Sequence, residues 1–178
     1  MTVDLNRRQA LRLLAGAAAA PLILRYGSAL AGVATPFTLG VASGDPWPDG
    51  FVIWTRLSTL PLFPGNEYAL PASIPVDWEV ALDENFSRIA QRGRTQALAI
   101  NGHAVHVELH GLQPGREYWY RFIALGERGT AGRALTLPAL NARVDRLKLG
   151  VASCAHYERG FFSAYRHMAN ERPDLVLF

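Results

Sequence analysis

The single cysteine of this 178-residue sequence, Cys154, is the side chain best suited to metal chemistry. It follows the apolar run 147–152 and a serine, where a strand is expected to end. Open α/β sheets place ligand sites at the carboxyl ends of their strands, and a metal deprotonates a coordinating thiol. A free cysteine is nevertheless more often a small buried hydrophobe. Residue chemistry alone therefore favours packing over metal binding for Cys154, and it excludes a disulfide within the chain.

Three histidines, His103, His106 and His110, are further candidate metal ligands. On a helix they would share a face, but apolar and polar residues alternate through 104–110, which predicts a strand. His106 and His110 would then stand ~13 Å apart at ~3.3 Å per residue, with His103 pointing away from both. Because the ligands of one ion converge to about 2 Å from it, we expect these histidines on a solvated face.

The first 31 residues have the order of an export signal. Arg7 and Arg8 precede an alanine-rich apolar run, and small residues up to Ala31 fit cleavage after that residue, as in a twin-arginine signal. The apolar run of about 12 residues is shorter than the ~20 that a spanning helix needs. We therefore expect export by the twin-arginine translocase, to the periplasm or outside the cell, without a stable membrane span.

The basic character of the chain belongs to this leader. The formal net charge is +3, and residues 1–31 hold four arginines against one aspartate. The rest of the chain is formally neutral, so its charge gives no signal for nucleic-acid binding.

Residues 32–140 are predicted to form a β-sandwich. Short alternating runs are separated by turn residues, and about seven such strands are typical of immunoglobulin-like or fibronectin-like sandwiches. The predicted strands are 37–43, 51–57, 76–82, 92–98, 104–110, 118–125 and 133–137. A Pro-Gly turn before Tyr118 predicts a tyrosine corner, whose phenol bonds to upstream backbone. We expect Asp45 and Asp49, beside prolines and Gly50, to be turn formers.

Residues 141–178 are predicted to begin a second domain. The runs 147–152 and 175–178 are expected to be strands, the second buried on both faces as in a parallel sheet. Between them, Phe161, Phe162, Tyr165 and Met168 suit one face of a helix over 160–170. About 40 residues cannot bury a core of their own, so we expect this unit to be the start of a larger domain.

Three stretches, in this order, resemble the alkaline phosphatase D (PhoD-like) family. They are GVASGDP with VIWTRL, at 40–46 and 52–57; LQPGREYWYRF, at 112–122; and GVASC, at 150–154, continuing through GFF to DLVLF at 160–178. The resemblance implies an N-terminal β-sandwich followed by a metallophosphatase domain with an α/β/β/α core. It also implies hydrolysis of phosphate monoesters and diesters at alkaline pH, with iron and calcium as cofactors and Cys154 as an iron ligand.

The resemblance thus reverses the preference at Cys154 in favour of metal binding. One cysteine cannot hold an iron ion, and no catalytic residue is assigned within the chain, so we expect this piece alone to be inactive. One alternative is an exported fibronectin-like module that binds glycans or proteins without catalysis. It accounts for 37–137 but not for the strand end at Cys154. A non-catalytic remnant of such an enzyme is a third interpretation.

Overall fold

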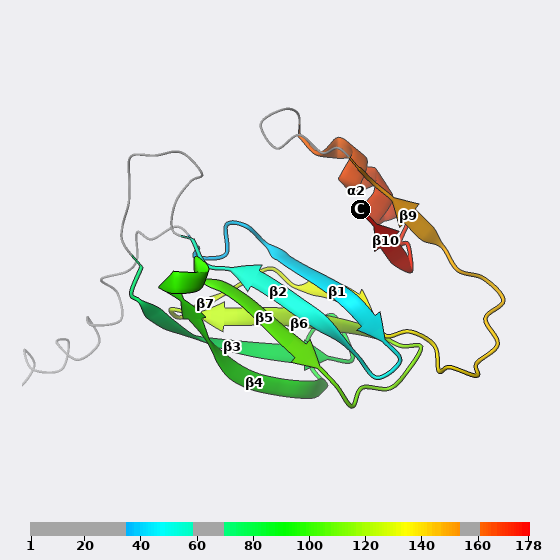
Figure 1. The fold of residues 1–178 in the computed structure, drawn as a ribbon, viewed down its shortest axis with the longest axis horizontal. Coiled ribbons are helices and arrows are strands. Elements are labelled where there is room, and N and C mark those ends of the chain that lie inside the picture. The colour runs from blue at the N-terminus through cyan, green and yellow to red at the C-terminus, as the bar shows by residue number, and fades with distance from the viewer. Residues whose placement is uncertain (1–34, 59–69, 154–160) are drawn as a thin grey trace, which may run out of the picture.

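A computed structural model of the chain describes residues 35–58, 70–153 and 161–178. Arg7, Arg8, Ala31 and Cys154, named above as signal and metal residues, lie outside the described residues. Figure 1 shows a long β-sandwich with a smaller strand–helix–strand unit beside one end. The described helices include none that is long and apolar enough to span a bilayer.

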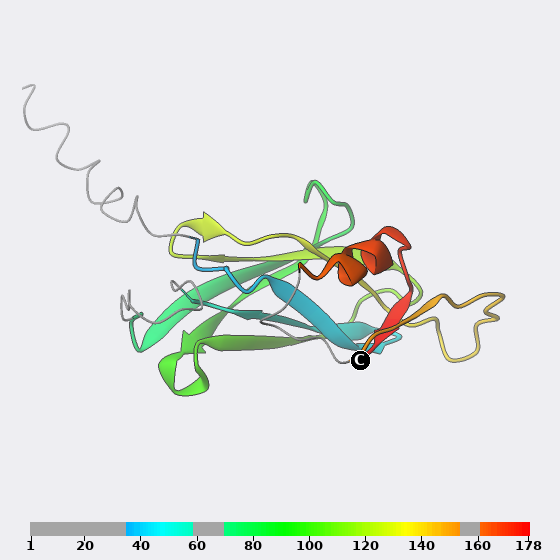
Figure 2. The ribbon, with the colours of Figure 1, turned by 90° about the horizontal axis from the view of Figure 1, so that it is seen from above.

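Two antiparallel sheets form the sandwich (Figures 1 and 2). One contains β1 (Val41–Trp47), β2 (Gly50–Arg56) and β5 (Ala104–Leu109), in the order β1-β2-β5. The other contains β4 (Ile89–Leu98), β3 (Ser73–Ala81), β6 (Glu117–Ala124) and β7 (Glu127–Arg128) in that spatial order, and β8 (Gly132–Leu135) also pairs with β6. A 3₁₀-helix, η1 (Ala99–Asn101), connects β4 to β5. The predicted fibronectin/immunoglobulin-like sandwich is confirmed.

The core lies between the sheets and follows the predicted alternation. In β6 the side chains of Tyr118, Tyr120 and Phe122 are buried, and they belong to one apolar cluster with Phe51 of β2. Burial raises the pKa of Tyr120 to about 12, although a hydrogen bond from the Ser43 side chain works in the opposite direction. Packing of this kind, from alternate residues of facing sheets, is what stabilises a sandwich.

The tyrosine corner is confirmed as well. The Tyr118 phenol oxygen accepts a hydrogen bond from the Gln113 backbone N–H at 2.8 Å. Thr136 adds to the same corner, since its hydroxyl donates to the Gln113 carbonyl at 2.7 Å. The turn before β6 is thereby tied to the strand that follows it and to the end of the sandwich.

The first hairpin differs from the prediction. The sequence predicts a strand that ends at residue 43, with Asp45 and Asp49 in the turn that follows, but β1 pairs with β2 as far as Trp47 and Gly50, across a β-bulge. Pro46 is tolerated because β1 is an edge strand and the bulge frees its neighbours from regular pairing. Asp45 therefore lies in the bulged strand with φ of 44°, and only Asp49 stands in the turn.

The last 30 residues contain the predicted parallel pair, formed by β9 (Leu149–Val151) and β10 (Leu175–Leu177). Helix α2 (Ser163–Asn170) lies between them in sequence and packs on Gly150, where an added Cβ would stand 2.9 Å from the Met168 sulfur. The expected burial of the second strand on both faces is wrong for the described residues, since Leu177 of β10 is 49% exposed. Phe161 and Phe162 precede the helix, and Tyr165 and Met168 supply its half-buried face.

Candidate functional site

The carboxyl edge of the β9–β10 pair is the first candidate site. Val151 and Leu177 are registered partners there, and the Ala152 N–H extends the pairing by donating to the Leu177 carbonyl at 2.9 Å. The chain leaves this edge toward Ser153, and the predicted ligand Cys154 follows outside the described residues. The structure thus shows a parallel strand pair, and the carboxyl edge of such a pair is where α/β sheets generally place ligands.

An aromatic cluster borders that edge. Tyr165 of α2 stacks on Phe162 with ring centroids 5.8 Å apart, and Phe178 meets Tyr165 edge-on at 6.0 Å. Phe178 nevertheless remains 86% exposed. The cluster is an apolar surface beside the candidate site rather than a source of acids, bases or ligands.

The amino edge of the pair is held by ionic contacts instead. The Lys148 N–H, just before β9, donates to the Asp174 carboxylate at 2.7 Å. The Lys148 ammonium contacts the Glu171 carboxylate at 2.8 Å and holds the pKa of Glu171 below its usual value. These contacts tie the entries of both strands together, at the edge opposite the candidate site.

A carboxylate of the sandwich connects to the same end of the unit. Glu117 at the start of β6 contacts Arg133 of β8, and its Oε1 accepts from Arg172 Nη2 at 2.7 Å. Arg133 also donates to the Pro173 carbonyl at 3.4 Å. Arg172 and Pro173 form the link between α2 and β10. Sequence reasoning missed this contact because Glu117 and Arg172 are 55 residues apart and each looks like an ordinary surface charge.

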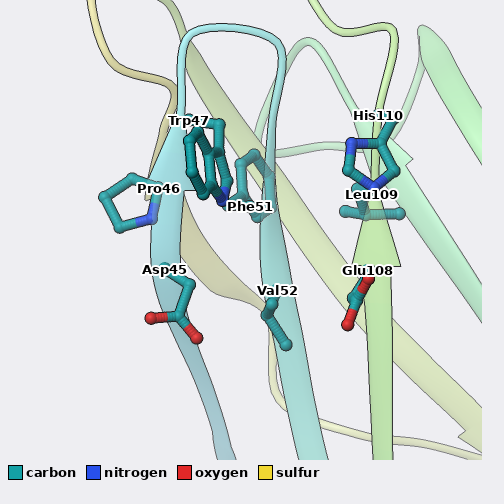
Figure 3. A pocket seen from close by; sticks show the side chains of 8 residues that line it. All are labelled: Asp45, Pro46, Trp47, Phe51, Val52, Glu108, Leu109 and His110. Carbon is teal, nitrogen blue, oxygen red and sulfur yellow. The ribbon is translucent and has the colours of Figure 1, made fainter.

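A second candidate site is an open cleft of about 620 Å³ over the β1–β2–β5 sheet (Figure 3). Its lining combines apolar, aromatic and acidic side chains: Asp45, Pro46, Trp47, Phe51, Val52, Glu108, Leu109 and His110. Sequence reasoning treated Asp45 as a turn former beside proline, so it did not anticipate the cleft.

The three histidines occupy different settings. His103 precedes β5 with φ of 57°, and its Nε2 lies 2.9 Å from the Pro71 carbonyl oxygen. His106 is exposed on β5 beside Trp54, with ring centroids 6.4 Å apart, and His110 lines the cleft. The predicted strand over 104–110 is confirmed for Ala104–Leu109. Across the described parts of the chain, no three His, Cys, Asp or Glu side chains converge as a metal site.

Comparisons with known proteins agree with this architecture. Residues 25–138 match the family model described as PhoD-like phosphatase, N-terminal domain. Alkaline phosphatase D of Bacillus subtilis (strain 168) is 48% identical over 142 residues, which is 79% of this chain and 24% of that protein. A solved structure described as PhoD matches with a TM-score of 0.75 and 47% identity, over 80% of this chain and 27% of the other. The chain spans about a quarter of the length of the curated relative. It belongs to the PhoD-like phosphatase family, and residues 25–138 correspond to the N-terminal domain of that family.

Proposed function

We propose that this chain is the N-terminal part of an exported, metal-dependent alkaline phosphatase that hydrolyses phosphate monoesters and diesters. The observation that carries the proposal is the 48% identity to an alkaline phosphatase D over 142 residues. This alignment is longer than the match to the family's N-terminal domain, which covers only residues 25–138. A sandwich module without catalysis does not account for the extra length, or for the parallel β9–β10 pair.

Cys154 is the one metal ligand that we assign within the chain, and iron is the ion that the family resemblance suggests for it. A thiolate three residues after the end of β9 would suit a transition metal in a sheet-edge site. Iron with calcium would polarise a phosphoryl oxygen and activate a water nucleophile. The described residues add no converging ligand set, so we derive no catalytic step from them. The 178 residues alone are proposed to be inactive, because one thiolate cannot hold an iron ion.

The described residues would therefore contribute to the proposed site only by positioning its edge. The β9–β10 pair presents its carboxyl edge, and the Lys148–Asp174 contact fixes the register of the two strands at the amino edge. Glu117 and Arg133 hold the link before β10 against the sandwich. This arrangement keeps structural ion pairs away from the edge that would carry the chemistry.

The test is hydrolysis of p-nitrophenyl phosphate and bis-p-nitrophenyl phosphate at alkaline pH, by the full product of the gene and by the 178-residue chain. We expect the full product to turn over both esters, with loss of activity on chelation and in Cys154→Ala. The 178-residue chain should show no turnover above buffer. A full product that is inactive with iron and calcium supplied would contradict the proposed reaction. Chelator-sensitive turnover by the short chain would contradict its proposed inactivity.

Export has its own test. We propose that Arg7 and Arg8 direct the chain to the twin-arginine translocase and that cleavage follows Ala31. Mass spectrometry of the exported protein should find Gly32 at its N-terminus. Arg7→Lys with Arg8→Lys should retain the protein in the cytoplasm, because a twin-arginine signal is read as the arginine pair itself. Export of the double-lysine variant at the normal level would refute this route without affecting the enzymatic proposal.

A further inference from the structure

The cleft over the β1–β2–β5 sheet exposes an aromatic ring that the fold does not use in its core. Trp47 is 61% exposed at the end of β1, whereas Phe51 at the cleft base is buried in the core cluster. A large aromatic side chain left exposed in a cleft is a common feature of binding sites. The indole offers an electron-rich face that attracts cations.

Two carboxylates accompany this ring from different strands. Figure 3 shows Asp45 on β1 and Glu108 on β5, on either side of Val52 of β2. Both side chains are exposed, and neither forms an ion pair within the ranges that the structure describes. Elsewhere on the sandwich, arginines pair with Asp77, at 2.6 Å, and with Glu79, at 2.7 Å. In a chain that is rich in arginine, the carboxylates of Asp45 and Glu108 are thus not neutralised by an ion pair with any described residue.

The backbone fixes this grouping. The bulge between Gly44 and Trp47 turns Asp45 out of the regular alternation of β1, with φ of 44°. On the other side, β5 approaches so closely that a Cβ on Gly50 would stand 1.7 Å from the Leu109 carbonyl oxygen. Close strand pairing thus holds the Glu108 end of β5 beside the hairpin that carries Trp47.

We propose that this cleft binds a small organic cation, an ammonium group with a short carbon body. Two carboxylates without an ion pair repel phosphate and other anions, and no lysine or arginine among the described residues lines the cleft. A bare metal ion would need more converging ligands than the described residues supply. An ammonium compound fits this lining, because Asp45, Glu108 and the face of the Trp47 ring all attract its positive charge and Val52 offers an apolar contact for its carbons. The proposal is independent of the phosphatase function.

The experiment compares choline with its uncharged carbon isostere, 3,3-dimethyl-1-butanol, by following the Trp47 indole N–H signal of the ¹⁵N-labelled chain at constant ionic strength. Choline should shift this signal and saturate, and the isostere should bind at least fivefold more weakly. Asp45→Asn and Glu108→Gln should each weaken choline binding about two- to fivefold, as expected for exposed charges. Asp77→Asn is the matched control, because that carboxylate lies on β3 outside the cleft, and it should leave the affinity unchanged.

Two further measurements complete the test. Raising the salt concentration should weaken choline binding and leave binding of the isostere unaffected. This comparison checks the electrostatic contribution to choline binding in the unmodified chain. A second probe, N-acetyl-lysine methylamide, imitates a lysine side chain of a partner protein. If it binds more tightly than choline, the natural ligand is a protein side chain rather than a free ammonium compound. The proposal would be overturned if choline and its isostere bound with equal affinity, or if neither cation moved the Trp47 signal. It would also be overturned if Asp77→Asn and Glu108→Gln lost the same amount of affinity for choline.

Discussion

Substitution of Glu117 should loosen the strand–helix–strand unit from the sandwich. The carboxylate is 27% exposed and contacts Arg133, whereas its second partner, Arg172, is 63% exposed. For so exposed a partner, screening by water limits the Arg172 contact to about 0.5–1 kcal/mol. The contact with Arg133 lies within the sandwich, but it positions the Arg133 guanidinium, which donates to the Pro173 carbonyl, and loss of that long hydrogen bond adds about 0.5–1 kcal/mol. We therefore expect Glu117→Gln to cost about 1–2 kcal/mol in local opening.

Hydrogen exchange read by mass spectrometry measures that opening directly over residues 163–177. A cost of about 1–2 kcal/mol corresponds to exchange roughly five- to thirtyfold faster in Glu117→Gln. Arg172→Ala alone should accelerate exchange about two- to fivefold. In the double variant, exchange should accelerate by less than the product of the two single-variant factors, because Glu117 and Arg172 share one contact.

The matched control is Asp77→Asn, which breaks the exposed contact with Arg94 on β3–β4 at 2.6 Å. It removes a carboxylate–arginine pair of the sandwich without touching the strand–helix–strand unit, so exchange over residues 163–177 should be unchanged. Normal exchange in Glu117→Gln would refute the reasoning. So would equal acceleration in Asp77→Asn, because the effect would then be a general loss of sandwich stability.

Three predictions concern the sandwich and are checked by urea unfolding. Tyr118→Phe should lower the free energy of unfolding by about 1 kcal/mol, because it removes the 2.8 Å hydrogen bond from the Gln113 N–H and leaves the ring in place; an unchanged midpoint would contradict this. Gly50→Ala should cost about 2–3 kcal/mol, because its Cβ would meet the Leu109 carbonyl oxygen at 1.7 Å. The pKa of Tyr120 is raised to about 12 by burial. The folded state therefore holds the phenol proton of Tyr120 more tightly than the unfolded state does. The protonated phenol makes its full contribution to the free energy of unfolding below pH ~10. About 2–3 kcal/mol of stability should be lost as the pH rises from ~10 through ~12, and Tyr120→Phe should lose less over the same range.

Much of the sandwich could be predicted because strand alternation is a local property. The side chains of a strand alternate between its faces, so the sequence around Tyr118, Tyr120 and Phe122 already identifies a buried face. The tyrosine corner is similarly local, since Tyr118 and Gln113 lie five residues apart. Boundaries were less predictable: Asp45 and Pro46 have turn propensities, but pairing with β2 extends the strand through them.

The amino-acid sequence by itself determined the β-sandwich, the parallel strand pair after it, and membership of the PhoD-like phosphatase family. The sandwich and the strand pair follow from short-range periodicity, whereas the family follows from similarity to known sequences. Only the tertiary structure decided which distant charges meet, such as Glu117 with Arg172, and which form no ion pair with another described residue, such as Asp45 and Glu108 near Trp47. The physical reason is that such contacts depend on strand order and register, which bring together residues whose local sequences contain no information about each other.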